Sequence, residues 1–156
     1  MAAESEYKVG GASGVQRMYL VAILSVGMVL VACGDDDAAA CVENLPETCT
    51  PGFTPNWNGV YQNVVVSSCG VNAGTACHGP DGKQGMLEMS SSNGAYSALL
   101  GHDGTRARVI PKDPSCSILI ERVTSEDPKF RMPLGGQLSA ATICAIQQWI
   151  EQGAQQ

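Results

Sequence analysis

Residues 69–80 read CGVNAGTACHGP, and this stretch determines how the rest of the chain is interpreted. It lies in a glycine-rich region: residues 70–104 contain eight glycines, far above the average content of about 7 %. Glycine disfavours continuous helix. The region is therefore expected to consist of irregular connections between short elements rather than one regular helix.

Two cysteines and a histidine in this stretch carry its chemistry. Cys-x-x-Cys-His is the attachment pattern of c-type haem, in which two thiols bond the vinyl groups at one porphyrin edge and the histidine lies under the iron. Here the spacing is Cys-x₇-Cys-His, five residues longer, although Cys77-His78-Gly79-Pro80 is intact. Gly70, Asn72 and Gly74 in the longer spacer are residues that suit a looped-out bulge.

A methionine further along the chain is a candidate for a second iron ligand. Met132 lies in the segment RMPLGG, residues 131–136, which has no good helical or strand pattern. Histidine with methionine as axial ligands raises the iron potential and suits electron transfer. Met86 and Met89 are alternatives nearer to the Cys-His element, and His102 is an alternative for bis-histidine ligation.

The clearest predicted helix closes the chain. Ser139 is a suitable N-cap, and Ile146, Trp149 and Ile150 share one apolar stripe at helical spacing. Gly153 is its expected stop. Three further helices are expected, one starting at Thr54-Pro55, a brief one over residues 95–100, and one from an Asp113 N-cap to Val123. No strand alternation stands out, so the sequence predicts a small all-α domain of short helices and long Gly-rich loops.

This order of motifs resembles a small class I cytochrome c domain, most closely the extracytoplasmic type of planctomycetes and myxobacteria. The resemblance covers residues 55–156. It rests on Cys77-His78-Gly79-Pro80 and on three further stretches, PKDPSCSIL at 111–119, MPLGG at 132–136 and IQQWIEQGA at 146–154. It implies haem c as cofactor, thioethers at Cys69 and Cys77, His78 as proximal ligand, Met132 as distal ligand, and one-electron transfer.

The N-terminal region resembles a bacterial lipoprotein signal. Residues 18–32 are apolar apart from Ser25 and Gly27, and Leu30-Val31-Ala32-Cys33 matches a lipobox. As a helix, this run would rise about 22 Å, short of the roughly 30 Å hydrocarbon core that a transmembrane helix crosses. We therefore expect a signal peptide over residues 1–32, with translation from Met1 or Met18, and a lipid anchor on Cys33.

Six cysteines follow Cys33, and an even number in an exported chain indicates disulfides or another paired use. Residues 33–54 are acidic and Pro/Gly-spotted, and we interpret them as a linker. Proximity in the sequence suggests Cys41 with Cys49. Cys116 and Cys144 are expected to bond to each other, because each lies in a predicted helix that must pack against a neighbour.

Charge and composition narrow the function further. Net charge is −6 over 156 residues, which argues against nucleic acid as a partner because that requires a basic footprint. No catalytic order of residues stands out, so an enzyme is not expected, and a copper site lacks the second histidine that blue-copper sites use. The prediction is a haem c electron-transfer protein anchored to the extracytoplasmic side of a bacterial membrane, with an unidentified redox partner. The alternative is a haem-free, disulfide-stapled interaction or structural domain in which Cys69 and Cys77 form a disulfide.

Overall fold

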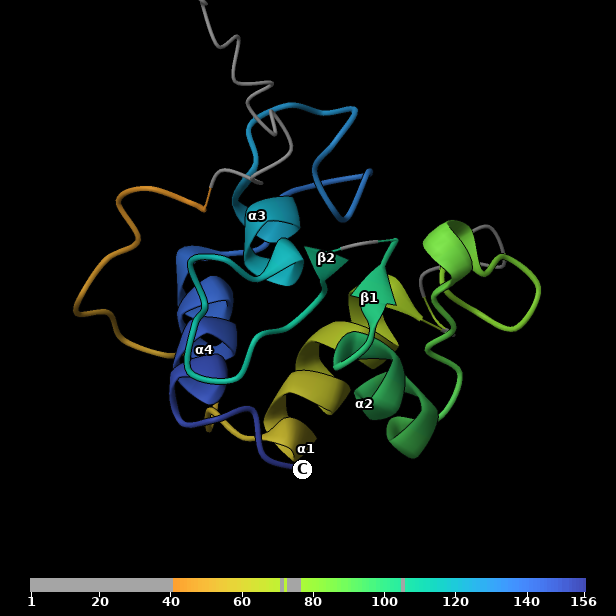
Figure 1. The fold of residues 1–156 in the computed structure, drawn as a ribbon, viewed down its shortest axis with the longest axis horizontal. Coiled ribbons are helices and arrows are strands. Elements are labelled where there is room, and N and C mark those ends of the chain that lie inside the picture. The colour runs from red at the N-terminus through yellow and green to blue at the C-terminus, as the bar shows by residue number, and fades with distance from the viewer. Residues whose placement is uncertain (1–40, 71, 73–76, 105) are drawn as a thin grey trace, which may run out of the picture. The chain divides into compact units, whose positions relative to one another are not determined.

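The computed structural model describes residues 41–70, 72, 77–104 and 106–156. This part of the chain is mostly helical, with a small two-stranded sheet and two disulfides (Figure 1). The predicted signal peptide and Cys33 lie outside the described residues. No helix in the described ranges is both long and apolar enough to cross a membrane.

The elements follow one another in a simple order. They are α1 (Trp57–Val60), a π-helical segment (Tyr61–Cys69), a 3₁₀ turn (Gln84–Met86), α2 (Ser92–Leu99), β1 (His102–Asp103), β2 (Arg106–Ala107), α3 (Ile118–Thr124) and α4 (Ala140–Glu151). The antiparallel pair of β1 and β2 was not predicted. The fold is thus helical in its main elements, as expected, but it is not purely α.

The closing helix α4 is confirmed, and its cause is local. The Ser139 hydroxyl accepts a hydrogen bond from the Thr142 N–H at 3.1 Å, which satisfies one of the N–H groups left open at a helix start. Ile146, Trp149 and Ile150 are buried along one side of the helix. This stripe forms part of the apolar core.

The first helix begins slightly later than predicted and extends far enough to deliver a cysteine. Asn56 is its N-cap and accepts from the Gly59 N–H at 2.8 Å. Helical backbone then continues through the π-helical segment to Cys69. Trp57 and Val64 on this element are buried in the core, so packing of the helix fixes where Cys69 lies.

An aromatic cluster joins the beginning and the end of the domain. The Trp57 ring lies 5.5 Å from Trp149, 5.3 Å from Tyr96 and 5.7 Å from Tyr61, centroid to centroid. Tilted and edge-on aromatic pairs at such distances add stabilisation beyond buried area. Few aromatics occur in the sequence, and half of them gather at this point.

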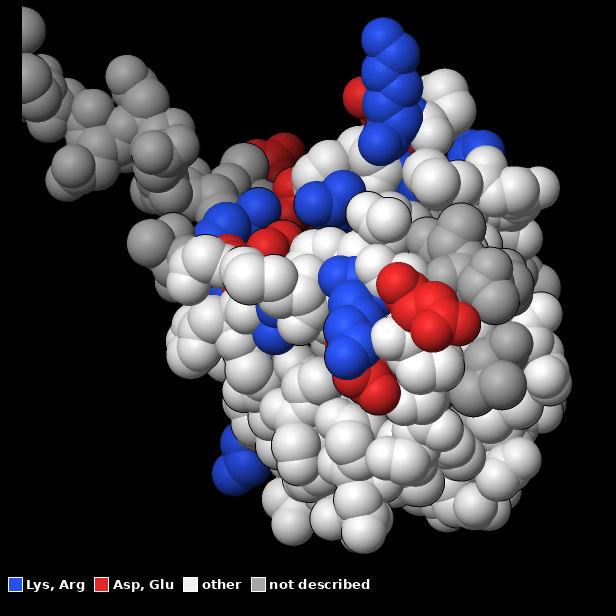
Figure 2. All heavy atoms as spheres, turned by 90° about the vertical axis from the view of Figure 1, so that its right-hand side faces the viewer, with Lys and Arg blue, Asp and Glu red and all other residues white. Residues whose placement is uncertain are grey.

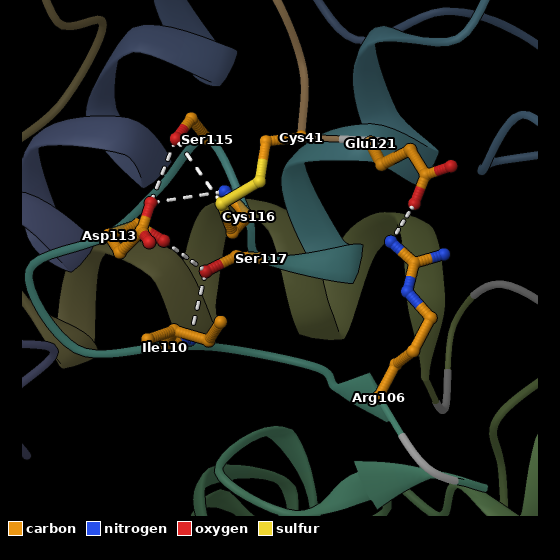
Figure 3. The surroundings of a disulfide bond; sticks show 8 residues. All are labelled: Cys41, Arg106, Ile110, Asp113, Ser115, Cys116, Ser117 and Glu121. Atoms are coloured by element: carbon orange, nitrogen blue, oxygen red, sulfur yellow. Dashed lines mark hydrogen bonds and ion pairs between the residues drawn. A yellow bond between two sulfur atoms is a disulfide. The ribbon is translucent and has the colours of Figure 1, made fainter. Parts of the chain in front are cut away.

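The helix predicted from Asp113 in fact starts at Ile118, so its predicted start is wrong. The Asp113 carboxylate accepts from the Ser115 hydroxyl and the Cys116 N–H, and its carbonyl accepts from the Ser117 hydroxyl (Figure 3). Aspartate side chains commonly stabilise turns in this way. The aspartate thus holds a turn ahead of α3, and Ser117 takes the N-cap position.

The predicted disulfide pairing is also wrong. Cys41 is bonded to Cys116, and Cys49 to Cys144. Residues 41–54 run beside the later elements, held by backbone hydrogen bonds from the Val42 N–H to the Ser115 carbonyl and from the Gly52 N–H to the Ala141 carbonyl, each 2.8 Å. This alignment brings each early cysteine to a late one, so distance along the sequence does not determine the pairing.

The Cys49–Cys144 bond spans 95 residues, and its removal should destabilise the domain substantially. Closing a loop of this length restricts the unfolded chain, and natural disulfides typically contribute about 2–4 kcal/mol. We expect the double variant Cys49→Ser/Cys144→Ser to lose about this much free energy of unfolding in urea titrations. Peptide mapping without reduction should link Cys49 to Cys144 in the native protein, and a Cys116–Cys144 peptide would contradict the pairing.

Candidate functional site

His78 is held in a defined orientation by a backbone carbonyl. Its Nδ1 lies 3.2 Å from the carbonyl oxygen of Leu87. Because a carbonyl can only accept, Nδ1 carries the proton in this hydrogen bond, and Nε2 is the nitrogen with a lone pair. This is the usual way in which a ligating histidine is oriented toward a metal.

The long spacer between the two cysteines is closed at its base. The His78 N–H donates to the Cys69 carbonyl at 3.2 Å, so the residue that follows Cys77 is bonded to Cys69 directly. The Gln84 N–H in turn donates to the Cys77 carbonyl at 3.2 Å. The five additional residues therefore do not separate the Cys-His element from Cys69.

A cavity of about 270 Å³ opens beside these residues. Cys69, Cys77, His78 and Met132, the four residues predicted to attach and ligate haem, all line it. Most of its wall is apolar, with contributions from Leu87, Met89, Leu99, Ile118, Leu119 and Val123. The fold thus brings together, around one apolar space, side chains from three separate parts of the sequence.

The alternative ligands differ in where they lie. Met86 is 83 % exposed, His102 is exposed on β1, and neither lines the cavity. Met89 is buried and does line it, but its N–H donates to the His78 carbonyl at 2.6 Å. Met132 comes from a different segment, where its N–H donates to the carbonyl of Arg122 in α3.

Charged residues on the cavity wall were missed in the sequence analysis. Arg108 and Arg122 both line the cavity, and so does Asp103. No sequence pattern predicted that these residues would line a cavity. Alternation along a strand would place Arg106 and Arg108 on the same face, yet only Arg108 lines the cavity. Within the described ranges, no group of three or more His, Cys, Asp or Glu side chains could hold a metal ion.

The environment of Cys69 suppresses its ionisation. Burial raises the pKa of the Cys69 thiol to about 12, and the nearby Cys77 adds to the shift. Both effects disfavour the thiolate, which is the nucleophilic form of cysteine. This cysteine is therefore a partly buried, protonated thiol at neutral pH.

The comparison with known families agrees with this arrangement. A family model described as Planctomycete cytochrome C matches residues 75–133, which include Cys77, His78 and Met132. The matched segment is similar to a cytochrome c domain of planctomycete type. Cys69 lies before the matched residues, so its assignment rests on the cavity and on the hydrogen bond to His78. No curated protein and no solved structure matches the chain.

The raised pKa of Cys69 predicts how the stability of the domain responds to alkali. The unfolded thiol loses its proton near its ordinary pKa of about 8.5, whereas the folded thiol keeps it to about pH 12. The folded state then binds more protons, so stability should fall as pH rises through this window, by at most about 1.4 kcal/mol per pH unit.

Urea titrations of haem-free protein at a series of pH values above 8 would measure this loss. In Cys69→Ala, the part of this loss of stability that is due to Cys69 should disappear. Other groups that titrate in alkali should contribute equally to both proteins. Equal pH slopes for the two proteins would contradict the assignment.

Proposed function

We propose that this domain binds haem c covalently through Cys69 and Cys77 and functions as an electron-transfer protein rather than an enzyme. The observation that carries the proposal is that both cysteines, His78 and Met132 line one apolar cavity. The donor set fits the group, since thiols form thioethers while imidazole and thioether sulfur are common axial ligands of haem iron. When bound, haem supplies a one-electron couple.

The protein's own residues would orient and shield this group. The Leu87 carbonyl fixes the tautomer and direction of His78, as carbonyl partners commonly do for metal-ligating histidines. Apolar side chains such as Leu99 and Val123 keep water from the cavity wall. Low polarity around an iron centre is one of the ways in which a protein tunes its potential.

Met132 is a better candidate than Met89 for the ligand opposite His78. Met89 is paired through its backbone with His78 itself, which favours the histidine side of the cavity. Met132 follows α3 and is bonded to the backbone of Arg122, independently of the Cys-His element. A ligand from a separate segment can approach from the other side.

Expression of the full chain in a host with haem c attachment machinery tests this function. The purified protein should be red, its haem should resist acid–acetone extraction, and the double variant Cys69→Ser/Cys77→Ser should lose covalent haem. If the wild-type protein carries no haem and Cys69 and Cys77 map to one disulfide, the electron-transfer function falls. The haem-free, disulfide-stapled domain would then be the better assignment.

Methionine variants of the same protein identify the axial ligand. Met132→Ala should abolish the thioether–iron charge-transfer band, lower the reduction potential and open the iron to carbon monoxide. Met86→Ala and His102→Ala are matched controls outside the cavity and should keep the band. Loss of the band in Met89→Ala, with the band retained in Met132→Ala, would reverse the assignment.

We further propose that the domain is extracytoplasmic, held to a bacterial membrane by lipid on Cys33, and has a protein redox partner rather than nucleic acid. The lipobox pattern at residues 30–33 supports the anchor. Figure 2 also argues against nucleic acid as a partner. On the face shown in this figure, Lys and Arg side chains lie close beside Asp and Glu side chains and do not form a basic patch.

The anchor is testable by cell fractionation. Cys33→Ser should move the protein from the membrane to the soluble extracytoplasmic fraction, because the lipid can no longer be attached. Retention of Cys33→Ser in the membrane with residues 18–32 uncleaved would instead indicate a transmembrane anchor.

A further inference from the structure

The two disulfides of the described residues differ in how well solvent reaches them. Cys41 is exposed and its partner Cys116 is half-buried. Cys144, by contrast, is only 2 % exposed, and its partner Cys49 is half-buried. A thiolate breaks a disulfide by attacking one of its sulfur atoms, so the reaction depends on access to that sulfur. Access therefore favours exchange at Cys41–Cys116 over exchange at Cys49–Cys144.

The surroundings of Cys116 suit it as the cysteine that leaves when Cys41 is attacked. The Ser115 hydroxyl oxygen lies 3.8 Å from the Cys116 sulfur (Figure 3). This hydroxyl donates to the Asp113 carboxylate at 2.8 Å, and rotation of its O–H bond would direct the proton to a thiolate on Cys116. The Asp113 carboxylate opposes a negative charge at this position, so proton uptake by Cys116 completes its release.

Residues 41–48, between the two disulfide attachments of this region, have few other ties to the domain. The Val42 N–H donates to the Ser115 carbonyl at 2.8 Å, and the Gln147 side chain donates to the Pro46 carbonyl at 3.0 Å. Val42 and Leu45 are partly buried against the core. The next covalent attachment is at Cys49. Opening of Cys41–Cys116 would therefore leave this short segment held by weak contacts alone.

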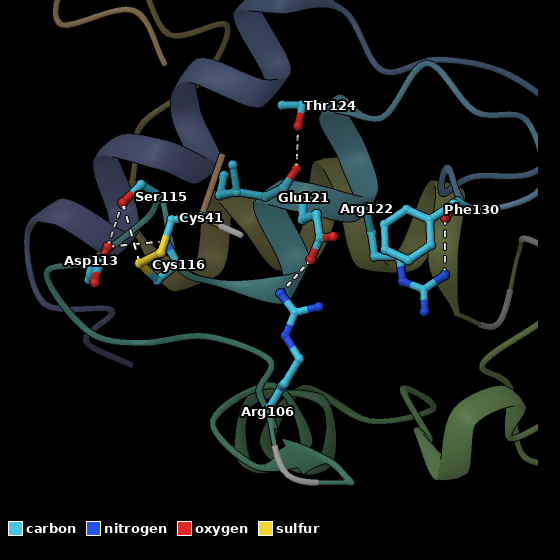
Figure 4. A network of polar contacts seen from close by, with 10 residues as sticks. Cys41, Arg106, Asp113, Ser115, Cys116, Glu121, Arg122, Thr124 and Phe130 are labelled. Carbon is cyan, nitrogen blue, oxygen red and sulfur yellow. Dashed lines mark hydrogen bonds and ion pairs between the residues drawn. A yellow bond between two sulfur atoms is a disulfide. The ribbon is translucent and has the colours of Figure 1, made fainter. Parts of the chain in front are cut away.

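Helix α3, which follows Cys116 closely, does not depend on this disulfide. Glu121 on α3 is paired with Arg106, as Figure 4 shows. The Arg122 guanidinium lies over the Phe130 ring, 3.8 Å from its centroid, and donates to the Phe130 carbonyl. These contacts remain when the disulfide opens. Reduction should therefore loosen residues 41–48 and leave the cavity wall that α3 forms in place.

We propose that Cys41–Cys116 is a site of thiol–disulfide exchange with a dithiol protein of thioredoxin type, whereas Cys49–Cys144 is a permanent structural bond. A thiolate of the partner attacks the Cys41 sulfur and forms a mixed disulfide, while Cys116 leaves with the electron pair of the broken S–S bond and takes up a proton. The partner's second thiolate then attacks the partner's own sulfur in the mixed disulfide, and Cys41 leaves and is protonated. The protein gains two thiols, and the partner becomes a disulfide.

Opening of this bond would lengthen the chain between the lipid anchor and the fixed part of the domain. This consequence, unlike the exchange itself, rests on the proposed function, because it requires lipid on Cys33. Cys41 follows Cys33 by eight residues, which span at most about 29 Å in any conformation. With the bond open, the first covalent attachment is Cys49, and sixteen residues span up to about 58 Å. Reduction would thus extend the reach of the domain from the membrane.

Capture of a mixed disulfide on the native full chain tests the proposal. The probe is a thioredoxin-type protein whose second active-site cysteine is replaced by serine, so that the mixed disulfide cannot resolve. Peptide mapping should find the probe bonded to Cys41. Capture at Cys49 or Cys144 instead, or no capture at Cys41, would overturn the proposal. Capture at Cys69 or Cys77 would count against the proposed function alone, because cysteines bonded to haem form no mixed disulfide.

The intact dithiol probe measures the difference between the two bonds. Alkylation followed by mass spectrometry should show Cys41 and Cys116 reduced at least about tenfold faster than Cys49 and Cys144, because a buried bond reacts only after local opening. Equal rates would mean that both bonds break on unfolding, and they would overturn the proposal.

A Glu-specific protease reports whether residues 41–48 are released. Glu43 and Glu47 are exposed, but a protease requires a locally unfolded chain. Cleavage at both should be several-fold faster after selective reduction, and equally fast in Cys41→Ser/Cys116→Ser. Glu121 on α3 is the internal control, and its cleavage should not change. Unchanged cleavage at Glu43 and Glu47 would overturn the lengthening of the chain to the anchor.

Discussion

An apolar cavity beside a small core is the constraint on which the rest of this domain depends. The residues that line the cavity make fewer packing contacts within the chain than core residues do, and a domain of this size has little stability to spare. The core concentrates its aromatics where α1 meets α4. The side that holds Cys69, Cys77 and His78 has the cavity instead, so the fold relies on other sources of stability.

The two disulfides supply one of these sources away from the cavity. Cys41–Cys116 and Cys49–Cys144 attach residues 41–54 to the segment before α3 and to α4, and none of the four cysteines lines the cavity. Gln147 and Gln148 on α4 reinforce the attachment by donating to the Pro46 and Cys49 carbonyls. The two disulfides thus stabilise the domain at positions outside the cavity wall.

Features that depend on neighbouring residues were predictable from the sequence. Ser139 and the apolar stripe of α4 are one example, because capping and helical spacing act within a few residues. The disulfide pairing was not predictable in this way, since it depends on how residues 41–54 lie against elements far along the chain. The helix start predicted at Asp113 was wrong for a local reason. An aspartate before proline suits both a helix cap and a turn, and the hydrogen bonds of Asp113 stabilise the turn.

The candidate site also combines features that the sequence predicts with features that depend on the fold. The types of Cys77, His78 and Met132 were enough to select them, while the long spacer counted against haem. In the structure one backbone bond, from the His78 N–H to the Cys69 carbonyl, holds the Cys-His element next to Cys69 despite the long spacer, and no residue pattern encodes this bond. Arg108 was missed because a buried cation has no signature in the sequence.

The partly buried thiol of Cys69 also bears on how haem would be attached in the proposed function. Thiolates are the reactive form of cysteine, and in the folded, haem-free domain burial holds the pKa of Cys69 at about 12. Near neutral pH the folded domain then presents almost no thiolate at this position, whereas the unfolded chain has an ordinary thiol. Within the proposed function, Cys69 would therefore react with haem more readily in the unfolded chain than in the folded domain. The same packing that protects a bound group would slow its attachment to a domain that has already folded.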